Sequence, residues 1–166
     1  MKQLLYLIFF FGVSLDTFSQ CSPTISILGS SFSESPPTFP TNRIGLDYES
    51  SDLLINRPGF ITISIANSNG CSNWQVSVDR VDITSNTNLS FWVRKTNDGS
   101  SFTSGASISP IGLTDFQEIT LGSQSFMSGV KDRQSIQINY KISGISVIRK
   151  KSTYFSNITF SVTGTP

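Results

Sequence analysis

The sequence contains no histidine, and charged residues make up only 14% of its 166 positions. Without histidine the chain cannot form Ser-His-Asp or Cys-His nucleophile pairs, or the commonest zinc and copper sites. Positive and negative charges nearly cancel, to a formal net charge of +1, so the chain lacks the basic signature of nucleic-acid binding. We therefore expect a protein that is not an enzyme and that holds no cofactor or metal.

Residues that favour helices are also scarce. Lysine, glutamate, alanine and leucine, which usually cover helix surfaces, are few, whereas serine and threonine make up roughly a quarter of the chain. Phenylalanine, glycine and asparagine are common. This mixture favours strands and turns over helices.

One long apolar run is present, at Leu4–Val13, and it follows the positive charge of Lys2. Ten residues at the helical rise span roughly half of a ~30 Å hydrocarbon core, which is too short for a stable anchor but typical of a secretory signal. The alternative is a buried N-terminal helix or strand. We expect residues 1–20 to be a signal peptide and residues 21–166 a single exported domain, in the periplasm, at the cell surface or outside the cell.

Cys21 and Cys71 are the two cysteines of the chain. In an exported protein an even pair first suggests a disulfide, and a bridge closing about 50 residues would be worth about 4 kcal/mol in the chain-entropy model. Two alternatives remain open. Cys21 could carry a lipid and hold the protein on a membrane, although Gln20 is bulky where a lipoprotein signal has a small residue, or both thiols could be free.

Alternating apolar and polar residues predict most of the strands. In 60–66, 74–83 and 157–163 the apolar members are Ile61, Ile63 and Ile65, then Trp74, Val76 and Val78, then Ile158, Phe160 and Val162. Further strands are expected in 88–95, 116–122, 135–143 and 145–149. Val81 and Ile83 change parity, which predicts a bulge or bend near Arg80.

Turn residues separate these segments. Asn67–Gly70 predicts a turn that leads into Cys71, the prolines within 30–42 predict a loop or sheet edge, and Asp98-Gly99 within 96–101 predicts a β-hairpin. Seven to nine short strands without a convincing helix must bury one face of each sheet against another. We expect an all-β fold, a single immunoglobulin-like antiparallel β-sandwich.

Carboxylates could supply catalysis in the absence of histidine. Asp79 and Asp82, and Asp115 and Glu118, lie close in sequence, and a glycosidase needs two carboxyls at a fixed separation. We interpret them instead as solvated strand charges. Asp98 alone is too little for a calcium loop, which needs several carboxylates.

Trp92 and Arg94 are the candidate contacts with a ligand or partner. Parity places them on one face of their strand, opposite Leu89, Phe91 and Val93, and a large aromatic on a sheet can stack on a sugar or anchor a protein interface. The alternative is a ring packed under a loop. The basic run at 149–151 is interpreted as a solvated turn.

The C-terminal segment "INYKISGISVIRKKSTYFSNITFSV" places Tyr154 four residues before an alternating terminal strand. Together with the Cys21–Cys71 spacing, it resembles bacterial spore coat protein U-type and chaperone–usher pilin-like domains. The resemblance implies an intramolecular disulfide that ties the first strands together. The glycine expected before the tyrosine is replaced by Ser152-Thr153. No free extension is expected before Cys21, which implies a terminal or non-polymerising relative.

We therefore expect a non-enzymatic structural or adhesive surface protein, pilin-like or coat-like, with a protein partner on the cell surface or in an extracellular assembly. The alternative is a carbohydrate- or ligand-binding β-sandwich that uses Trp92. A hydrolase using Asp79, Asp82 or Glu118 is a third hypothesis. No nucleic-acid partner is expected, and a membrane contact only if Cys21 is lipidated.

Overall fold

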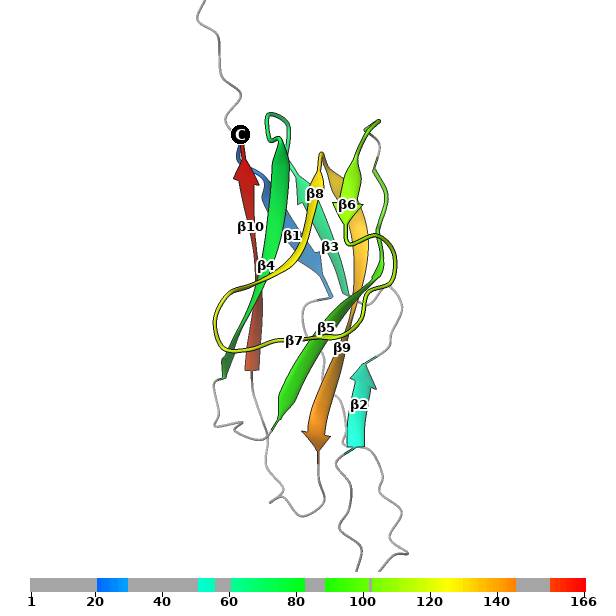
Figure 1. Cartoon of the computed structure of the whole chain (residues 1–166), viewed down its shortest axis with the longest axis vertical. Helices are drawn as coiled ribbons and strands as arrows, with labels where there is room; N and C mark the ends of the chain where they lie inside the picture. Colours follow the sequence, from blue (N-terminus) through cyan, green and yellow to red (C-terminus); the bar gives the residue numbers. More distant parts are fainter. Residues whose placement is uncertain (1–20, 30–50, 56–60, 83–88, 102, 146–155) are drawn as a thin grey trace, which may run out of the picture.

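A computed structural model describes residues 21–29, 51–55, 61–82, 89–101, 103–145 and 156–166 (Figure 1). These residues form strands, turns and bends, with no helix among them. The strands make two antiparallel sheets, one six-stranded and one four-stranded, which enclose a shared apolar core. The expected all-β sandwich is thereby confirmed.

The six-stranded sheet is built around β9, a strand of 13 residues. On one side of β9 lies β5; on the other, β3 pairs with its first half and β2 with its second half. β1 and β7 are the outer strands beside β3 and β5. The bounds are β1 (Thr24–Leu28), β2 (Ser51–Ile55), β3 (Ile61–Ala66), β5 (Ser90–Asn97), β7 (Gln117–Glu118) and β9 (Arg133–Ile145).

The four-stranded sheet has the order β10-β4-β8-β6. Its bounds are β4 (Asn73–Asp82), β6 (Ser107–Ser109), β8 (Gln124–Val130) and β10 (Ser156–Thr165). β10 and its neighbour β4 lie far apart in sequence. The two strands are nevertheless paired along the whole length of β10 without a register shift. β10, the C-terminal strand, lies at one side of the sandwich (Figure 1).

The core follows the alternation of the sequence. Inward residues of β3, β4, β5 and β9 are almost completely buried, because every second side chain of a strand points to the same face. This confirms the inward faces predicted for the strands at 60–66 and 74–83, and Phe160 of the strand predicted at 157–163 is buried as well. The buried apolar residues are Ile61, Ile63, Ile65, Trp74, Val76, Val78, Phe91, Val93, Ile108, Ile119, Phe126, Met127, Ile136, Ile138, Tyr140 and Phe160.

The bend predicted near Arg80 is wrong. β4 keeps its register with β10 through Asp82, so parity carries Arg80 inward and leaves Val81 54% exposed. Arg80 is tolerated there because its guanidinium lies 5.0 Å from the Phe91 ring centroid and its Nε lies 3.1 Å from Asp82 Oδ1. A register shift does occur elsewhere, between β4 and β8, where Phe126 is the extra residue.

The hairpin predicted at Asp98-Gly99 is also wrong, although the turn itself exists. Gly99 has a φ of +67°, and its N–H donates to Asn97 Oδ1 at 2.7 Å. The chain then leaves the six-stranded sheet, since β5 and the next strand, β6, belong to different sheets. The left-handed glycine serves a corner between sheets here, where Ser100 forms an isolated bridge with Gln134.

The strand predicted at 116–122 is shorter than expected, since only Gln117 and Glu118 form β7. Its neighbourhood still has a structural role: Ile119 N–H donates to Phe91 O at 2.7 Å, and Leu121 then bridges Arg80 of the other sheet. This segment therefore crosses from one sheet to the other. The signal peptide predicted at 1–20, the loop at 30–42, the segment 146–149 and Tyr154 lie outside the described residues.

Candidate functional site

Trp92 and Arg94 lie where parity predicted, on the outer face of the six-stranded sheet. They are not isolated there. Arg94 Cζ lies 4.4 Å from the ring centroid of Phe116, and Lys141 Nζ lies 4.6 Å from the Trp92 ring and 5.4 Å from the Phe116 ring. Cation–π attraction of this kind holds the four side chains together. We call them the outer aromatic cluster.

Three elements of the fold bring the outer aromatic cluster together. β5 provides Trp92 and Arg94, β9 provides Lys141 directly opposite Trp92, and Phe116 immediately precedes β7. The sequence alone gave no reason to join Phe116 or Lys141 to the other two. Both come from parts of the chain that pairing with β5 brings near.

The outer aromatic cluster is not an open stacking platform. Trp92 and Arg94 are both only half-exposed, and Lys141 occupies one side of the indole. Two donors of the outer aromatic cluster, Trp92 Nε1 and Arg94 Nε, are buried and have no hydrogen-bond acceptor among the described residues. A ligand acceptor could satisfy them only after the cluster opened, because both atoms are buried. The role predicted for Trp92 and Arg94 as ligand or partner contacts stays a prediction.

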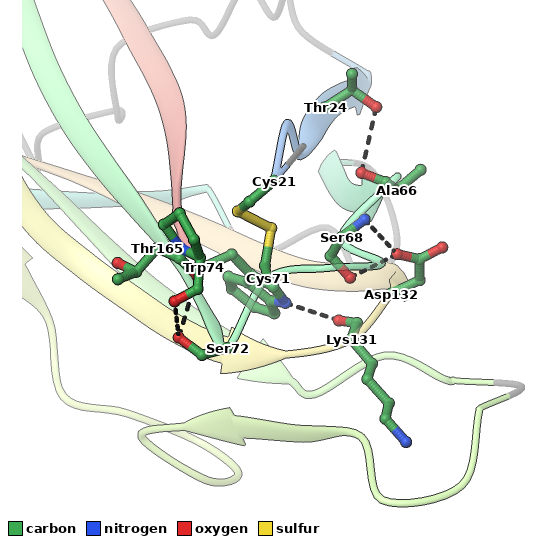
Figure 2. Close-up of a disulfide and its surroundings, with 11 residues drawn as sticks. Cys21, Thr24, Ala66, Ser68, Cys71, Ser72, Trp74, Lys131, Asp132 and Thr165 are labelled. Atoms are coloured by element: carbon green, nitrogen blue, oxygen red, sulfur yellow. Dashed lines mark hydrogen bonds between the residues drawn. A yellow bond between two sulfur atoms is a disulfide. The ribbon is translucent and has the colours of Figure 1, made fainter. Parts of the chain in front are cut away.

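Cys21 and Cys71 form a disulfide, with an S–S distance of 2.06 Å and a Cα–Cα distance of 4.8 Å. The same sulfur of Cys21 cannot also carry a lipid, so the bridge decides between the alternatives left open by the sequence. Figure 2 shows the bridge between the segment before β1 and the segment before β4. It therefore joins the two sheets at one end of the sandwich.

The disulfide sits directly over the C-terminal strand. A Cβ added at Gly164 of β10 would overlap Cys21 Sγ and would lie 2.8 Å from Cys71 Sγ. Glycine is required at this position because of that close approach. On the other side of Cys71, Ser72 N–H donates to Thr165 O at 2.8 Å. The bridge and these contacts fix the end of β10 (Figure 2).

Three further hydrogen bonds order the turn before Cys71 and the residues that follow it. Ser68, which is buried, donates from its N–H at 2.9 Å and from its hydroxyl at 2.7 Å to Asp132 Oδ1. Trp74 Nε1 donates to Lys131 O at 2.7 Å (Figure 2). Both acceptors lie just before β9, so these bonds tie the turn at Asn67–Gly70 to the opposite strand connection.

Lys95 and Asp98 form an ion pair that the sequence reasoning missed. The Lys95 residue is completely buried, and its ammonium donates to Asp98 Oδ1. Gly112 N–H donates to both oxygens of the same carboxylate at 2.9 Å. A signal was present: Lys95 continues the inward parity of Phe91 and Val93, and an acidic residue follows three positions later.

Electrostatics around Asp98 favours its ionised form. Burial opposes ionisation, but the hydrogen bond from Lys95, the Gly112 N–H and the positive charges of Lys95 and Arg133 together hold the pKa of Asp98 below its ordinary value of 3.8. The carboxylate is thus committed to protein partners. In the described ranges, no three histidine, cysteine or acidic side chains lie close enough together to hold a metal.

The acidic residues considered for catalysis each take part in local structure or face solvent. Asp79 Oδ1 accepts a hydrogen bond from Gly122 N–H at 2.9 Å. Asp82 pairs with Arg80 and accepts from Ser156 Oγ at 2.7 Å. Asp79 and Asp82 are three residues apart on β4, so they point to opposite faces. Asp115 and Glu118 are exposed.

The outer edge of β10 is the remaining candidate site. The other edge strands are short: β1 and β2 have five residues, β6 three and β7 two, whereas β10 has ten. No strand among the described residues pairs with the outer edge of β10. Its sequence, SNITFSVTGT, contains no charge and no proline, and its register with β4 has no bulge.

Natural proteins usually blunt an exposed edge with charges, proline, bulges or short strands. β10 has none of these features. It is instead rich in threonine, isoleucine, valine and phenylalanine, which favour strands. Its exposed side chains are small and polar, and they are Asn157, Thr159, Ser161, Thr163 and Thr165. We call this edge the β10 edge.

Comparison with protein-family models, with curated proteins and with solved structures finds no match to this chain. Within the described ranges, no helix has the length and apolar character needed to span a membrane. The fold and the candidate sites define the protein by its architecture alone: an antiparallel β-sandwich closed by one disulfide. The disulfide is compatible with an oxidising, exported environment.

Proposed function

We propose that this protein is a non-enzymatic, exported structural or adhesive protein that joins an assembly at the cell surface or outside the cell. Within that proposal the sandwich is immunoglobulin-like, and of the pilin-like or coat-like kind that the C-terminal segment resembles. The observation that carries the proposal is the β10 edge. Support also comes from the disulfide, because such bridges persist in oxidising compartments.

The β10 edge suits strand addition from a protein partner. An added strand would gain main-chain hydrogen bonds along up to ten residues, and its alternate side chains would meet the two faces of the sheet. The inward row at the edge includes Ile158 and Val162, which are half-exposed and pack against the core. A neighbouring strand would cover more of both side chains, and apolar burial is worth about 25 cal/mol per Å².

The disulfide prepares the β10 edge for such a partner. Gly164 lies against the bridge, and Thr165 O accepts from Ser72 N–H. The disulfide and the segment before β4 therefore hold the end of β10 in place. Along the rest of its length β10 is paired with β4. An edge that is already ordered loses little conformational freedom when a partner binds, and this favours association.

The test is a photo-crosslinking amino acid placed at Thr163, an exposed position on β10, in cells that produce the protein. The same residue placed at Ser107, exposed on the far edge strand β6, is the matched control. We expect surface-exposed protein that crosslinks to a protein from position 163 and not from 107. A protein that is absent from the surface, or that is strictly monomeric and uncrosslinked, would contradict the proposal.

A carbohydrate-binding module is the second candidate function. The observation in its favour is the outer aromatic cluster, in which Trp92 Nε1 and Arg94 Nε lack acceptors within the described ranges. Sugar hydroxyls could accept from both groups if Lys141 moved off the indole. A glycan array tests this candidate, with Trp92→Ala as the variant expected to lose binding. An array without hits, or a variant that binds unchanged, would remove it.

A further inference from the structure

We infer that the partner at the β10 edge is a second copy of this chain, paired antiparallel about a twofold axis that passes Phe160. This inference rests on the proposed function and specifies the partner at the same edge. The result would be one continuous sheet made from the two four-stranded sheets. A twofold contact uses the same surface on both copies, so β10 must complement itself.

Strand parity restricts the possible registers. Directly opposite residues in an antiparallel pair point to the same face of the sheet, so an inward residue must meet an inward residue. In β10 the even-numbered residues, such as Phe160, point inward and the odd-numbered ones, such as Ser161, point outward. A twofold axis placed between two residues would pair even-numbered residues with odd-numbered ones, and so inward side chains with outward ones. The axis must therefore pass through a residue. The two registers with the longest overlap are centred on Phe160 and on Ser161.

The disulfide distinguishes these two registers. Centring on Ser161 would place Ile158 of the second copy opposite Gly164, where the Cys21 and Cys71 sulfurs already fill the space above the glycine. Centring on Phe160 places the small Ser156 there instead. It also pairs Ile158 with Val162 of the second copy, so apolar side chains meet on the inward face. The register centred on Phe160 therefore fits the edge better.

The outward face is also self-compatible in this register. Thr159 meets Ser161 of the second copy, and Asn157 meets Thr163. Because β10 carries no charge, two copies approach without the like-charge repulsion that normally separates identical edges. A strand with lysine or glutamate at these positions would not have this property.

The test adds charges at the outward positions nearest the axis. In Thr159→Lys/Ser161→Lys, each lysine directly faces a lysine of the second copy, and two such pairs should weaken dimerisation about tenfold. In Thr159→Lys/Ser161→Glu, each lysine faces a glutamate, and dimerisation should recover. Both variants carry a lysine at position 159. This position lies opposite Asp79 of β4, whose carboxylate accommodates the added positive charge. Ser107→Lys/Ser109→Lys on β6 is the control with the same added charge at the far edge.

Dimer dissociation is measured by sedimentation velocity on the purified protein at low ionic strength, with circular dichroism to show that each variant is folded. Weakening by two lysines and recovery with lysine and glutamate would support the inference. Three outcomes overturn it. A dimer that ignores the lysine pair uses another surface. A lysine–glutamate variant that stays weakened indicates another register. A monomer that still crosslinks through position 163 in cells has a different partner, and in that case the proposed function survives.

Discussion

Removing the negative charge of Asp98 should destabilise the fold more than any other single charge change among the described residues. Asp98→Asn keeps the shape of the side chain and one acceptor oxygen but leaves the completely buried Lys95 ammonium without an anion. Breaking a buried ion pair by removing one partner costs about 3–5 kcal/mol. We expect about 3 kcal/mol, the lower end of this range, because a quarter of the Asp98 side chain remains exposed.

Two further variants separate the charge from the contact. Lys95→Met removes the buried cation and leaves Asp98 partly solvated and bonded to Gly112 N–H, so the loss should be about 1 kcal/mol. In Lys95→Met/Asp98→Asn neither charge remains, and replacing a buried pair by uncharged groups is often neutral. The double variant should therefore be more stable than Asp98→Asn alone. Asp115→Asn, at an exposed carboxylate, is the control and should change stability by less than about 0.5 kcal/mol.

The pH dependence gives an independent test. The pKa of Asp98 is lowered in the folded state, so the unfolded chain binds more protons near that pH and stability rises with pH there. The contribution of the pair is present above the ordinary Asp98 pKa of 3.8 and is lost as the pH falls through the lowered folded value. Wild type and Asp98→Asn should therefore differ at pH 7 and converge in acid.

Urea denaturation, monitored by circular dichroism, measures the free energy of unfolding of each variant. A loss of less than about 1 kcal/mol in Asp98→Asn, the size of an ordinary hydrogen bond, would refute the cost assigned to the unpaired Lys95 charge. A double variant that is no more stable than Asp98→Asn would refute it as well, since the loss would then not come from that charge.

Three other changes have expected outcomes. Gly164→Ala forces a Cβ against the disulfide and should destabilise the fold by about 1–3 kcal/mol in thermal unfolding. Reduction of Cys21–Cys71 opens a loop of 50 residues and should lower the free energy of unfolding by about 4 kcal/mol. Ser68→Ala removes the shorter of the two hydrogen bonds to Asp132 Oδ1 at a buried position. The free energy of unfolding measured in urea should therefore fall by about 1–2 kcal/mol.

Matched controls accompany these changes. Thr163→Ala, on the neighbouring exposed position of β10, controls for Gly164→Ala, and Ser123→Ala, at an exposed position, controls for Ser68→Ala. If either control loses as much as its partner, the loss does not come from the contact described. A reducing agent that leaves the unfolding midpoint unchanged would show that the bridge adds no stability.

The sequence already contained most of the information about which residues form the core. Ile61, Ile63 and Ile65 alternate with polar residues, and this period of two is a local property that requires no knowledge of the partner strand. The same parity placed Trp92 and Arg94 together on one face. The turn at Asn67–Gly70 was predictable too, because its residues favour backbone conformations that other residues avoid.

Several strands gave no clear local signal. β6 has three residues and β7 has two, and such lengths are stabilised by their neighbours and not by their own sequence. β8 carries a glycine, Gly129, which approaches the ring of Trp74 too closely for any Cβ. The bend predicted at Arg80 failed for a related reason. An inward arginine looks unfavourable in isolation, but Asp82 and the Phe91 ring, both supplied by the fold, stabilise it.

The sequence by itself determined the fold class, the inward and outward faces of the main strands and the two cysteines available for a bridge, because each depends on residue type and local spacing. Only the tertiary structure decided which strands became neighbours. It placed Gly164 under the disulfide, brought Asp98 to Lys95, and left β10 at an edge of the sheet that the described strands form. Edge position is a relation between distant segments, so no local pattern encodes it. The absence of charge in β10 became informative only once its outer side was seen to have no neighbouring strand among the described residues.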